Sequence, residues 1–204
     1  MIARVVVSVV AAVVLVVGCA QKQDRTRTDG TGATVQPDVT SDPAQRVSEL
    51  RRRADELAAA AQRMPGRSAS EDRALAAEAF DKAASALELL GGPNPGGAFR
   101  QQVRIIDNTR NFLRTGSESI AMEPSVDSGL RSVQGALVGV QQRLFPDDPE
   151  IQKRLDALAA RVRELDTVRG PLHSLVTAQT FEAASQVVDA MAQQMEGRTA
   201  AAGA

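Results

Sequence analysis

The chain has 204 residues, with 24 Lys and Arg against 25 Asp and Glu and a formal net charge of −1. A balance this close to zero gives no reason to expect nucleic acid or another polyanion as a partner. Trp and Tyr are absent and Phe occurs five times, so the aromatic side chains that stack on bases or sugars are scarce. Alanine, leucine, arginine and glutamine are abundant and all favour helices, so the composition predicts an all-α domain.

Residues 1–18 have the features of a secretory signal peptide. Arg4 supplies a positive charge, and the run from Val5 to Val17 is apolar apart from Ser8. A membrane-spanning helix is the alternative, but about 13 apolar residues at about 1.5 Å each extend only about 20 Å, against a hydrocarbon core of about 30 Å. The segment therefore favours a cleaved leader, with an uncleaved signal anchor as the alternative.

The leader ends in the tetrapeptide Val16, Val17, Gly18 and Cys19. This pattern resembles the lipobox of bacterial lipoprotein precursors, in which an aliphatic residue, a small or aliphatic residue and a small residue precede an obligatory cysteine. The resemblance implies that Cys19 forms a thioether to diacylglycerol, that the chain is cut before Cys19, and that the new amino terminus is often acylated. Two or more acyl chains hold a protein firmly on a membrane.

The same resemblance implies a location outside the cytoplasm. Ala20 follows the cysteine, and in enteric-type bacteria an Asp at this position tends to retain lipoproteins in the inner membrane. We therefore expect the outer membrane, facing the periplasm, if the source has one, and otherwise the outer face of the plasma membrane. Cys19 is the only cysteine, which excludes a disulfide framework.

Residues 19–42 are expected to be the lipidated cysteine followed by a flexible tether. They mix charged residues, Thr, Gly and Pro, with only Val35 and Val39 as larger apolar groups. So little apolar surface cannot offset the entropy lost on ordering. A flexible chain of this length has a root-mean-square reach of about 25 Å, so we expect the folded domain to lie near the bilayer rather than in it.

Residues 43–196 are expected to form the helical domain, because apolar residues recur there at intervals of three and four. Asp42 and Asp148, each followed by proline, have the chemistry of helix N-caps. Ser68 and Glu71 are spaced as a capping box. The six expected helices begin at Pro43, after Ser68, near Ala98, at Pro124, at Pro149 and at Pro171.

Six helices of about 20 residues, each about 30 Å long and joined by short connections, favour antiparallel neighbours in a bundle. Three stacked αα-hairpins are the alternative, since the helix starts at Pro43, Ala98 and Pro149 divide the chain into three parts of similar size. No repeat is detectable at the residue level to support a solenoid. We expect residues 197–204 to form a disordered tail.

The fourth expected helix carries a second stripe of small residues, in which Ser128, Ser132, Gly135 and Gly139 step by four, three and four. Glycine inside a helix costs about 1 kcal/mol relative to alanine, and close approach of another backbone would offset that cost. This stripe is expected to pack against another helix of the chain. The alternative is that it docks a partner or a second copy.

No residue pattern predicts catalysis, a metal site or a cofactor. His173 is the only histidine, and no cysteine or acidic cluster lies at ligand spacing from it. A Gly-x-Ser-x-Gly nucleophile elbow is also missing. Buried, clustered carboxylates in the structure would revive an enzymatic hypothesis.

The sequence therefore predicts a non-catalytic binding or scaffolding module of the cell envelope. Its expected partners are the membrane, through the N-terminal lipid, and either an unidentified envelope protein or a second copy. The alternative is a carrier that holds a small apolar ligand in a cavity between helices.

Overall fold

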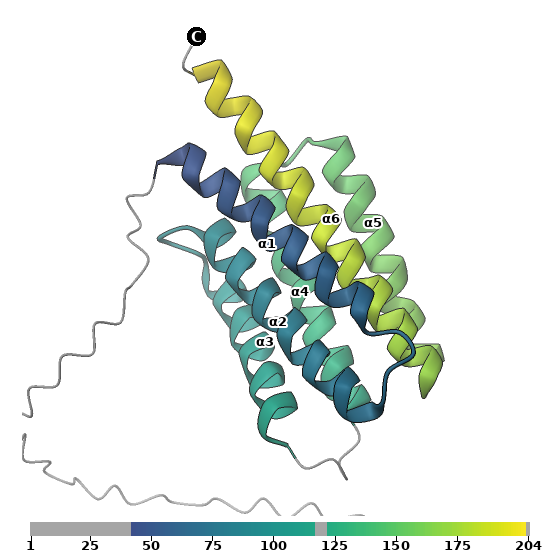
Figure 1. The fold of residues 1–204 in the computed structure, drawn as a ribbon. Coiled ribbons are helices and arrows are strands. Elements are labelled where there is room, and N and C mark those ends of the chain that lie inside the picture. The colour runs from purple at the N-terminus through teal and green to yellow at the C-terminus, as the bar shows by residue number, and fades with distance from the viewer. Residues whose placement is uncertain (1–41, 117–121, 203–204) are drawn as a thin grey trace, which may run out of the picture. The chain divides into compact units, whose positions relative to one another are not determined.

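The computed structural model describes residues 42–116 and 122–202 (Figure 1). These residues form six α-helices, one short 3-10 turn and no strand, which confirms the all-α prediction. The predicted signal peptide, Cys19 and the tether as far as residue 41 lie outside the described residues. The helices are α1 (Pro43–Arg63), α2 (Ala69–Gly91), α3 (Gly97–Thr115), α4 (Glu123–Leu144), α5 (Pro149–Glu164) and α6 (Pro171–Ala202), with the 3-10 turn at Leu165–Thr167.

The helices begin where the capping residues predict. The Asp42 carboxylate accepts a hydrogen bond from the backbone N–H of Ala44, at 3.1 Å. The Ser68 hydroxyl accepts from the Glu71 N–H and the Glu71 carboxylate accepts from the Ser68 N–H, completing the capping box. Asp148 accepts from two N–H groups in the first turn of α5. These side chains satisfy backbone donors that have no partner inside the helix.

The six helices close into a bundle. Consecutive helices run antiparallel (Figure 1), and α1 packs most extensively against α6, the last helix. In a stack of hairpins each repeat contacts only its neighbours, so the first and last helices would not meet. Because consecutive helices alternate in direction, α2, α4 and α6 begin at one end of the bundle, whereas α1 begins and α6 ends at the other.

The helix α6 has 32 residues and packs against α1, α2, α4 and α5. Its inner side buries polar residues such as Thr177 and Thr180 beside the apolar ones, whereas Leu175, Glu182 and Gln186 share an exposed face. Leu172 continues the three- and four-residue apolar spacing of this helix, which predicts a buried position, but it is 52% exposed.

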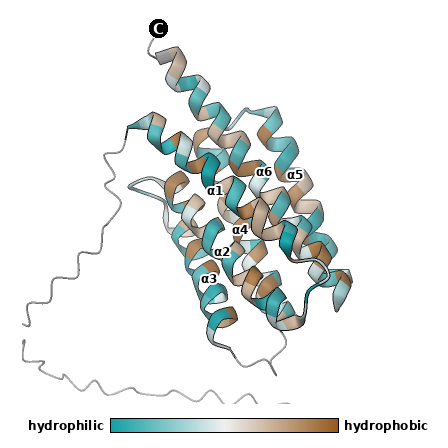
Figure 2. Ribbon diagram, in the orientation of Figure 1, coloured by the Kyte–Doolittle hydropathy of each residue, from teal (hydrophilic) through white to brown (hydrophobic). Residues whose placement is uncertain are grey.

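The outer helices have the expected single apolar face, with hydrophobic residues toward their neighbours and hydrophilic residues outward (Figure 2). Between α2 and α6, the rings of Phe80 and Phe181 meet edge to face, with centroids 4.9 Å apart. In α1 the apolar residues that recur at intervals of three and four are all buried: Val47, Leu50, Ala54, Leu57, Ala61 and Met64.

The prediction of a disordered tail is wrong for residues 197–202, where α6 continues to Ala202. The Arg198 guanidinium donates to the Leu144 carbonyl, 2.8 Å away at the end of α4, and lies 4.8 Å from the centroid of the Phe145 ring. Two residues earlier, Glu196 pairs with Arg51 of α1. These contacts and the helix-forming alanines extend α6 past the position where apolar periodicity ends.

Among the residues that the structure describes, no helix is both long and apolar enough to cross a bilayer.

Candidate functional site

The small-residue stripe of α4 is mostly at the surface. Ser128, Gly135 and Gly139 are exposed, and only Ser132 is buried. A Cβ atom added at Gly139 would have nothing within 4 Å, and one at Gly135 would meet only the Gln102 side chain, at 3.3 Å. The prediction that another helix of the chain covers this stripe is therefore wrong. That a partner docks there stays a prediction.

Close packing of α4 depends instead on Gly129, which the sequence analysis did not single out. A Cβ atom at this buried position would lie 2.6 Å from Cε1 of Phe80 and 3.0 Å from Cγ2 of Thr109. Because real Cβ atoms do not approach other atoms so closely, Gly129 is the residue that lets α2 and α3 approach α4.

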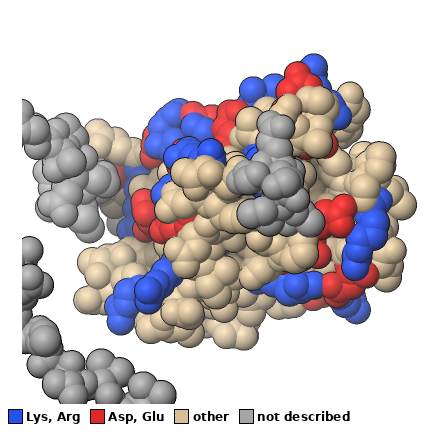
Figure 3. Space-filling model, turned by 90° about the horizontal axis from the view of Figure 1, so that it is seen from below, with Lys and Arg blue, Asp and Glu red and all other residues tan. Residues whose placement is uncertain are grey.

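A polar cleft of about 760 Å³ lies at the end of the bundle where α2, α4 and α6 begin. The connection between α1 and α2 and the first turns of the three helices form its walls. Seen from this end, acidic and basic side chains are interspersed, and neither sign forms a continuous patch (Figure 3). The charged and polar residues on its walls include Arg67, Asp72, Arg73, Glu123, His173 and Ser174.

His173 connects α6 to α4 beside the cleft. Its side chain is almost completely buried, with the residue only 1% exposed. The ring nitrogen Nε2 lies 2.7 Å from Oδ1 of Asp127, and Nδ1 lies 3.4 Å from Oγ1 of Thr177, one turn further along α6. Both nitrogens thus have partners, as buried polar groups require.

Asp72 connects α2 to α6, but only one of its two carboxylate oxygens has a hydrogen-bond partner in the described residues. The Ser174 hydroxyl donates to Oδ2 of Asp72 at 2.6 Å. The residue is 7% exposed, yet its other carboxylate oxygen, Oδ1, has no hydrogen-bond partner in the described part of the chain. A buried polar atom without a partner costs about 1–3 kcal/mol, and more when it is charged.

Two further contacts hold the walls of the cleft together. Arg73 of α2 donates to the Gly116 carbonyl at 2.6 Å, and its guanidinium lies 5.4 Å from the centroid of the Phe112 ring in α3. Glu123, at the start of α4, accepts from the Gly170 backbone N–H at 2.8 Å, just before α6 begins. The cleft is therefore built on helix ends that are linked to one another.

Comparisons with protein-family models, with curated proteins and with solved structures find no match.

The cleft brings together buried carboxylates, a histidine and a serine, which is the arrangement that would revive an enzymatic hypothesis. Nucleophilic catalysis requires the hydroxyl to contact the base. Ser174, on the cleft wall, donates to Asp72, and the hydroxyl that lies near the His173 ring is that of Thr177. Because Thr177 is 2% exposed and is not on the cleft wall, the geometry offers no relay from a hydroxyl in the cleft to the His173–Asp127 pair.

A metal site is not supported either. No group of three or more His, Cys, Asp or Glu residues in the two described segments is arranged to hold a metal ion. Asp72 contributes to the wall of the cleft, but its unpartnered Oδ1 atom is buried from solvent.

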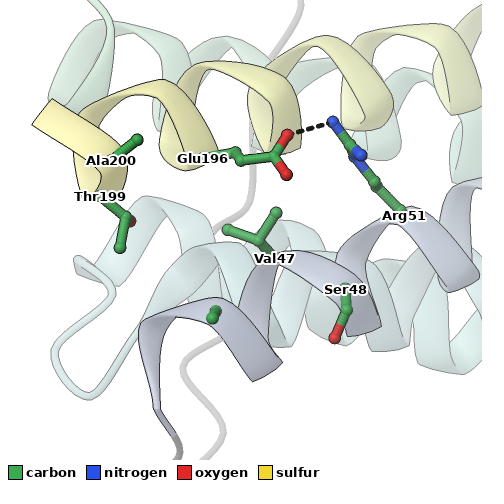
Figure 4. A pocket seen from close by; sticks show the side chains of 7 residues that line it. Val47, Ser48, Arg51, Glu196, Thr199 and Ala200 are labelled. Carbon is green, nitrogen blue, oxygen red and sulfur yellow. Dashed lines mark hydrogen bonds and ion pairs between the residues drawn. The ribbon is translucent and has the colours of Figure 1, made fainter.

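A smaller groove of about 240 Å³ lies at the opposite end, between the first turns of α1 and the last turns of α6 (Figure 4). Val47, Ala44 and Ala200 give it an apolar lining, and the Arg51–Glu196 pair borders it. It lies on the surface near the start of α1, so it differs from the cavity between helices that the apolar-carrier hypothesis predicts.

Proposed function

We propose that this protein is a non-catalytic binding module of the cell envelope, anchored through lipid on Cys19 and binding its ligand or partner in the polar cleft. The observation that supports the binding role is Asp72, a buried carboxylate with one unsatisfied oxygen on the wall of a cleft. The first turn of α2 favours the negative charge of Asp72, but no described residue donates to its second oxygen.

The position of the cleft fits an anchored protein. The chain enters the bundle at Asp42, the N-cap of α1, and the cleft lies at the other end of the bundle. α1 has 21 residues, so about 30 Å separates the two ends. A tether attached at residue 42 would leave the cleft free to meet a partner in the periplasm or outside the cell.

Fatty-acid labelling tests the anchor. Cells that express the protein are grown with radioactive palmitate, and the wild type is compared with Cys19→Ala. We expect label in the wild type and none in the variant, because the thioether and the new amino terminus both belong to residue 19. Equal labelling of both proteins, or of neither, would refute the lipid anchor.

Site-specific photo-cross-linking tests the binding role. A photoreactive residue at Ser70, on the cleft wall, is compared with one at Asp147. Asp147 lies in the connection from α4 to α5, and because α4 begins at the cleft, this connection is at the opposite end of the bundle. We expect adducts from position 70 in the intact envelope and few from position 147. Adducts only from position 147 would locate the binding surface elsewhere.

The alternative function, a carrier of a small apolar ligand, has less support. The larger cleft has apolar surface, but charged side chains such as Arg67 and Glu123 lie among it, and the apolar groove beside Val47 is small and open at the surface. Native mass spectrometry of protein purified from its host distinguishes the two, because a carrier would retain an apolar ligand.

A further inference from the structure

We propose that the apolar groove between α1 and α6 is the docking site for residues 37–41 of this chain, with the side chain of Val39 packed against Val47. These five residues immediately precede the described part of the chain. The proposed function concerns the lipid on Cys19 and the cleft at the other end of the bundle, and neither is needed for this contact.

The groove is apolar and lies where the chain enters the bundle. Its volume is about 240 Å³, and Ala44 and Val47 of α1 line it opposite Ala200 of α6. Both alanines are exposed. Val47 points from α1 toward α6, and the Arg51–Glu196 ion pair borders the end of the groove that is further from the start of α1 (Figure 4). An apolar side chain that covered this surface would be removed from water, which is favourable.

The chain that enters α1 is long enough to reach the groove. Val39 is three residues before Asp42, the N-cap of α1, so an extended chain can place it up to about 10 Å from Asp42. Val47 is five residues after Asp42, and at about 1.5 Å per helical residue it lies about 7.5 Å along α1. Val39 therefore reaches the level of Val47 if the chain turns back along the first turns of α1.

Such a turn has a common local form. In the hydrophobic staple, an apolar residue just before the N-cap packs against one in the first turns of the helix and fixes the direction in which the chain enters. Ser41 and Arg46 occupy these two positions in α1, and both are polar. Val39 and Val47 are the nearest valines on either side of them, so they are suited to replace the usual pair.

The sequence of residues 37–41 suits an extended segment with one apolar edge. Pro37 and Val39 alternate with the polar residues Asp38 and Thr40. Side chains two residues apart share one side of an extended chain. With Val39 in the groove, Asp38 and Thr40 would therefore point toward solvent.

This contact would change how an anchored bundle is held. With residues 37–41 packed along α1, the chain would leave the bundle beside α6 rather than from the tip of α1. The pull of a membrane anchor would then act on α1 and α6 together, and these two helices make the most extensive helix–helix contact in the described residues.

Disulfide cross-linking of the full chain in detergent tests the proposal. Val39→Cys is combined with Ala200→Cys, and the matched control combines Asp38→Cys with Ala200→Cys. The control cysteine has nearly the same reach, but its side chain would point away from the groove. Both pairs are also made with Cys19→Ala, which leaves no other cysteine, so the result does not depend on the lipid.

We expect the Val39→Cys pair to form a disulfide within one chain at least about tenfold faster than the control, because the bond requires Cα atoms about 4.4–6.8 Å apart. Ala44→Glu places a charge on the lining of the groove at an exposed position. We expect this variant to reduce the rate of the Val39→Cys pair to that of the control.

Thermal unfolding, followed by the helical circular dichroism signal, gives an independent measurement. Val39→Ser would remove the packed side chain, and we expect its Tm to be lower by about 2–4 °C. Val35→Ser makes the same change four residues earlier and should leave the Tm unchanged. A Tm for Val39→Ser equal to that of the wild type would overturn the proposal.

Two cross-linking results would also overturn it. Equal rates for the two pairs would show that residues 37–41 do not dock in one orientation. Disulfides that mainly join two chains would assign the groove to a second copy. Neither result would bear on the lipid anchor, which fails separately if Cys19-dependent labelling is absent.

Discussion

At the residue scale, we expect substitution by alanine at Gly129 and at Gly139 of α4 to change the free energy of unfolding in opposite directions. Gly129→Ala would place a Cβ atom 2.6 Å from the fully buried Phe80 ring, so we expect the free energy of unfolding to fall by about 1–3 kcal/mol. The Cβ atom of Gly139→Ala would have no other atom within 4 Å. We expect this variant to raise the free energy of unfolding by about 0.5–1 kcal/mol, since alanine is the better helix former. Urea unfolding of both variants measures the difference.

A result in which both substitutions stabilise the protein would show that Phe80 moves aside without cost, and that Gly129 is not needed for the close approach of α2 to α4.

The sequence could not distinguish these glycines. Their spacing along α4 is readable, but the face that meets Phe80 depends on which helices surround α4, and no local signal carries that information. The spacing alone therefore predicts that the stripe of Ser128, Ser132, Gly135 and Gly139 packs against another helix, although all of it except Ser132 is exposed.

The buried pair of Asp127 and His173 makes a second prediction at this scale. Asp127→Ala removes the partner of the Nε2 atom of His173, a residue that is only 1% exposed. We therefore expect the free energy of unfolding to fall by about 1–3 kcal/mol. Asp147→Ala, at an exposed position in the connection from α4 to α5, should change the free energy of unfolding by less than about 0.5 kcal/mol. Equal effects of the two variants in urea unfolding would contradict a structural role for the pair.

At the scale of elements, ion pairs connect α1 to α2. Glu56 of α1 lies 3.0 Å from the Nζ atom of Lys82 in α2 and also pairs with Arg52 and Arg53 of its own helix. Desolvation is the largest single influence and raises the pKa of Glu56, but Lys82, Arg52 and Arg53 together outweigh it and hold this pKa below its usual value. The folded state therefore binds a proton at Glu56 less readily than the unfolded state does.

The sign of the pH dependence follows from this lowered pKa. Glu56 contributes stability above its unfolded-state pKa, and the contribution is lost as the pH falls through the lowered folded-state value. We expect Glu56→Gln to cost about 0.5–1 kcal/mol at pH 7 and to cost little in strong acid, where the wild-type carboxyl is protonated too. Urea unfolding at a series of pH values measures this, and a cost that does not change with pH would contradict the assignment.

Most element boundaries could be predicted from the sequence, because the signals are local. Asp42, Ser68 and Asp148 satisfy nearby backbone donors, and such short-range chemistry leaves a readable pattern. The cleft could not be predicted in this way. The Ser174–Asp72 bond joins residues 102 positions apart, and the only hint in the sequence is the polar group of His173, Ser174 and Thr177 at the start of a helix that is otherwise largely apolar.

At the scale of the whole molecule, the fold depends on the packing of α6 against α1, α2, α4 and α5. Apolar spacing predicts the six helices but not which of them pack together, because that depends on contacts between distant segments. The length of α6 beyond residue 196 also depends on such contacts, as Arg198 meets the end of α4.

Truncation after Glu196 tests the role of these last turns. Removal of residues 197–204 deletes the hydrogen bond from Arg198 to Leu144 and the contact with the Phe145 ring. We expect a loss of about 1–2 kcal/mol, from one charged hydrogen bond and one cation–π contact. Arg198→Ala should reproduce most of it, whereas Thr199→Ala should not. An unchanged Tm on truncation would restore the prediction of a disordered tail.

The central claim is that this helical bundle is held on a membrane outside the cytoplasm by lipid on Cys19. Intact-mass spectrometry of the protein extracted from the membranes of its host measures this directly. We predict a chain that begins at Cys19 and carries the added mass of a diacylglycerol group, with or without an acyl chain on the new amino terminus. A chain that begins at Met1 with an unmodified cysteine would contradict the account.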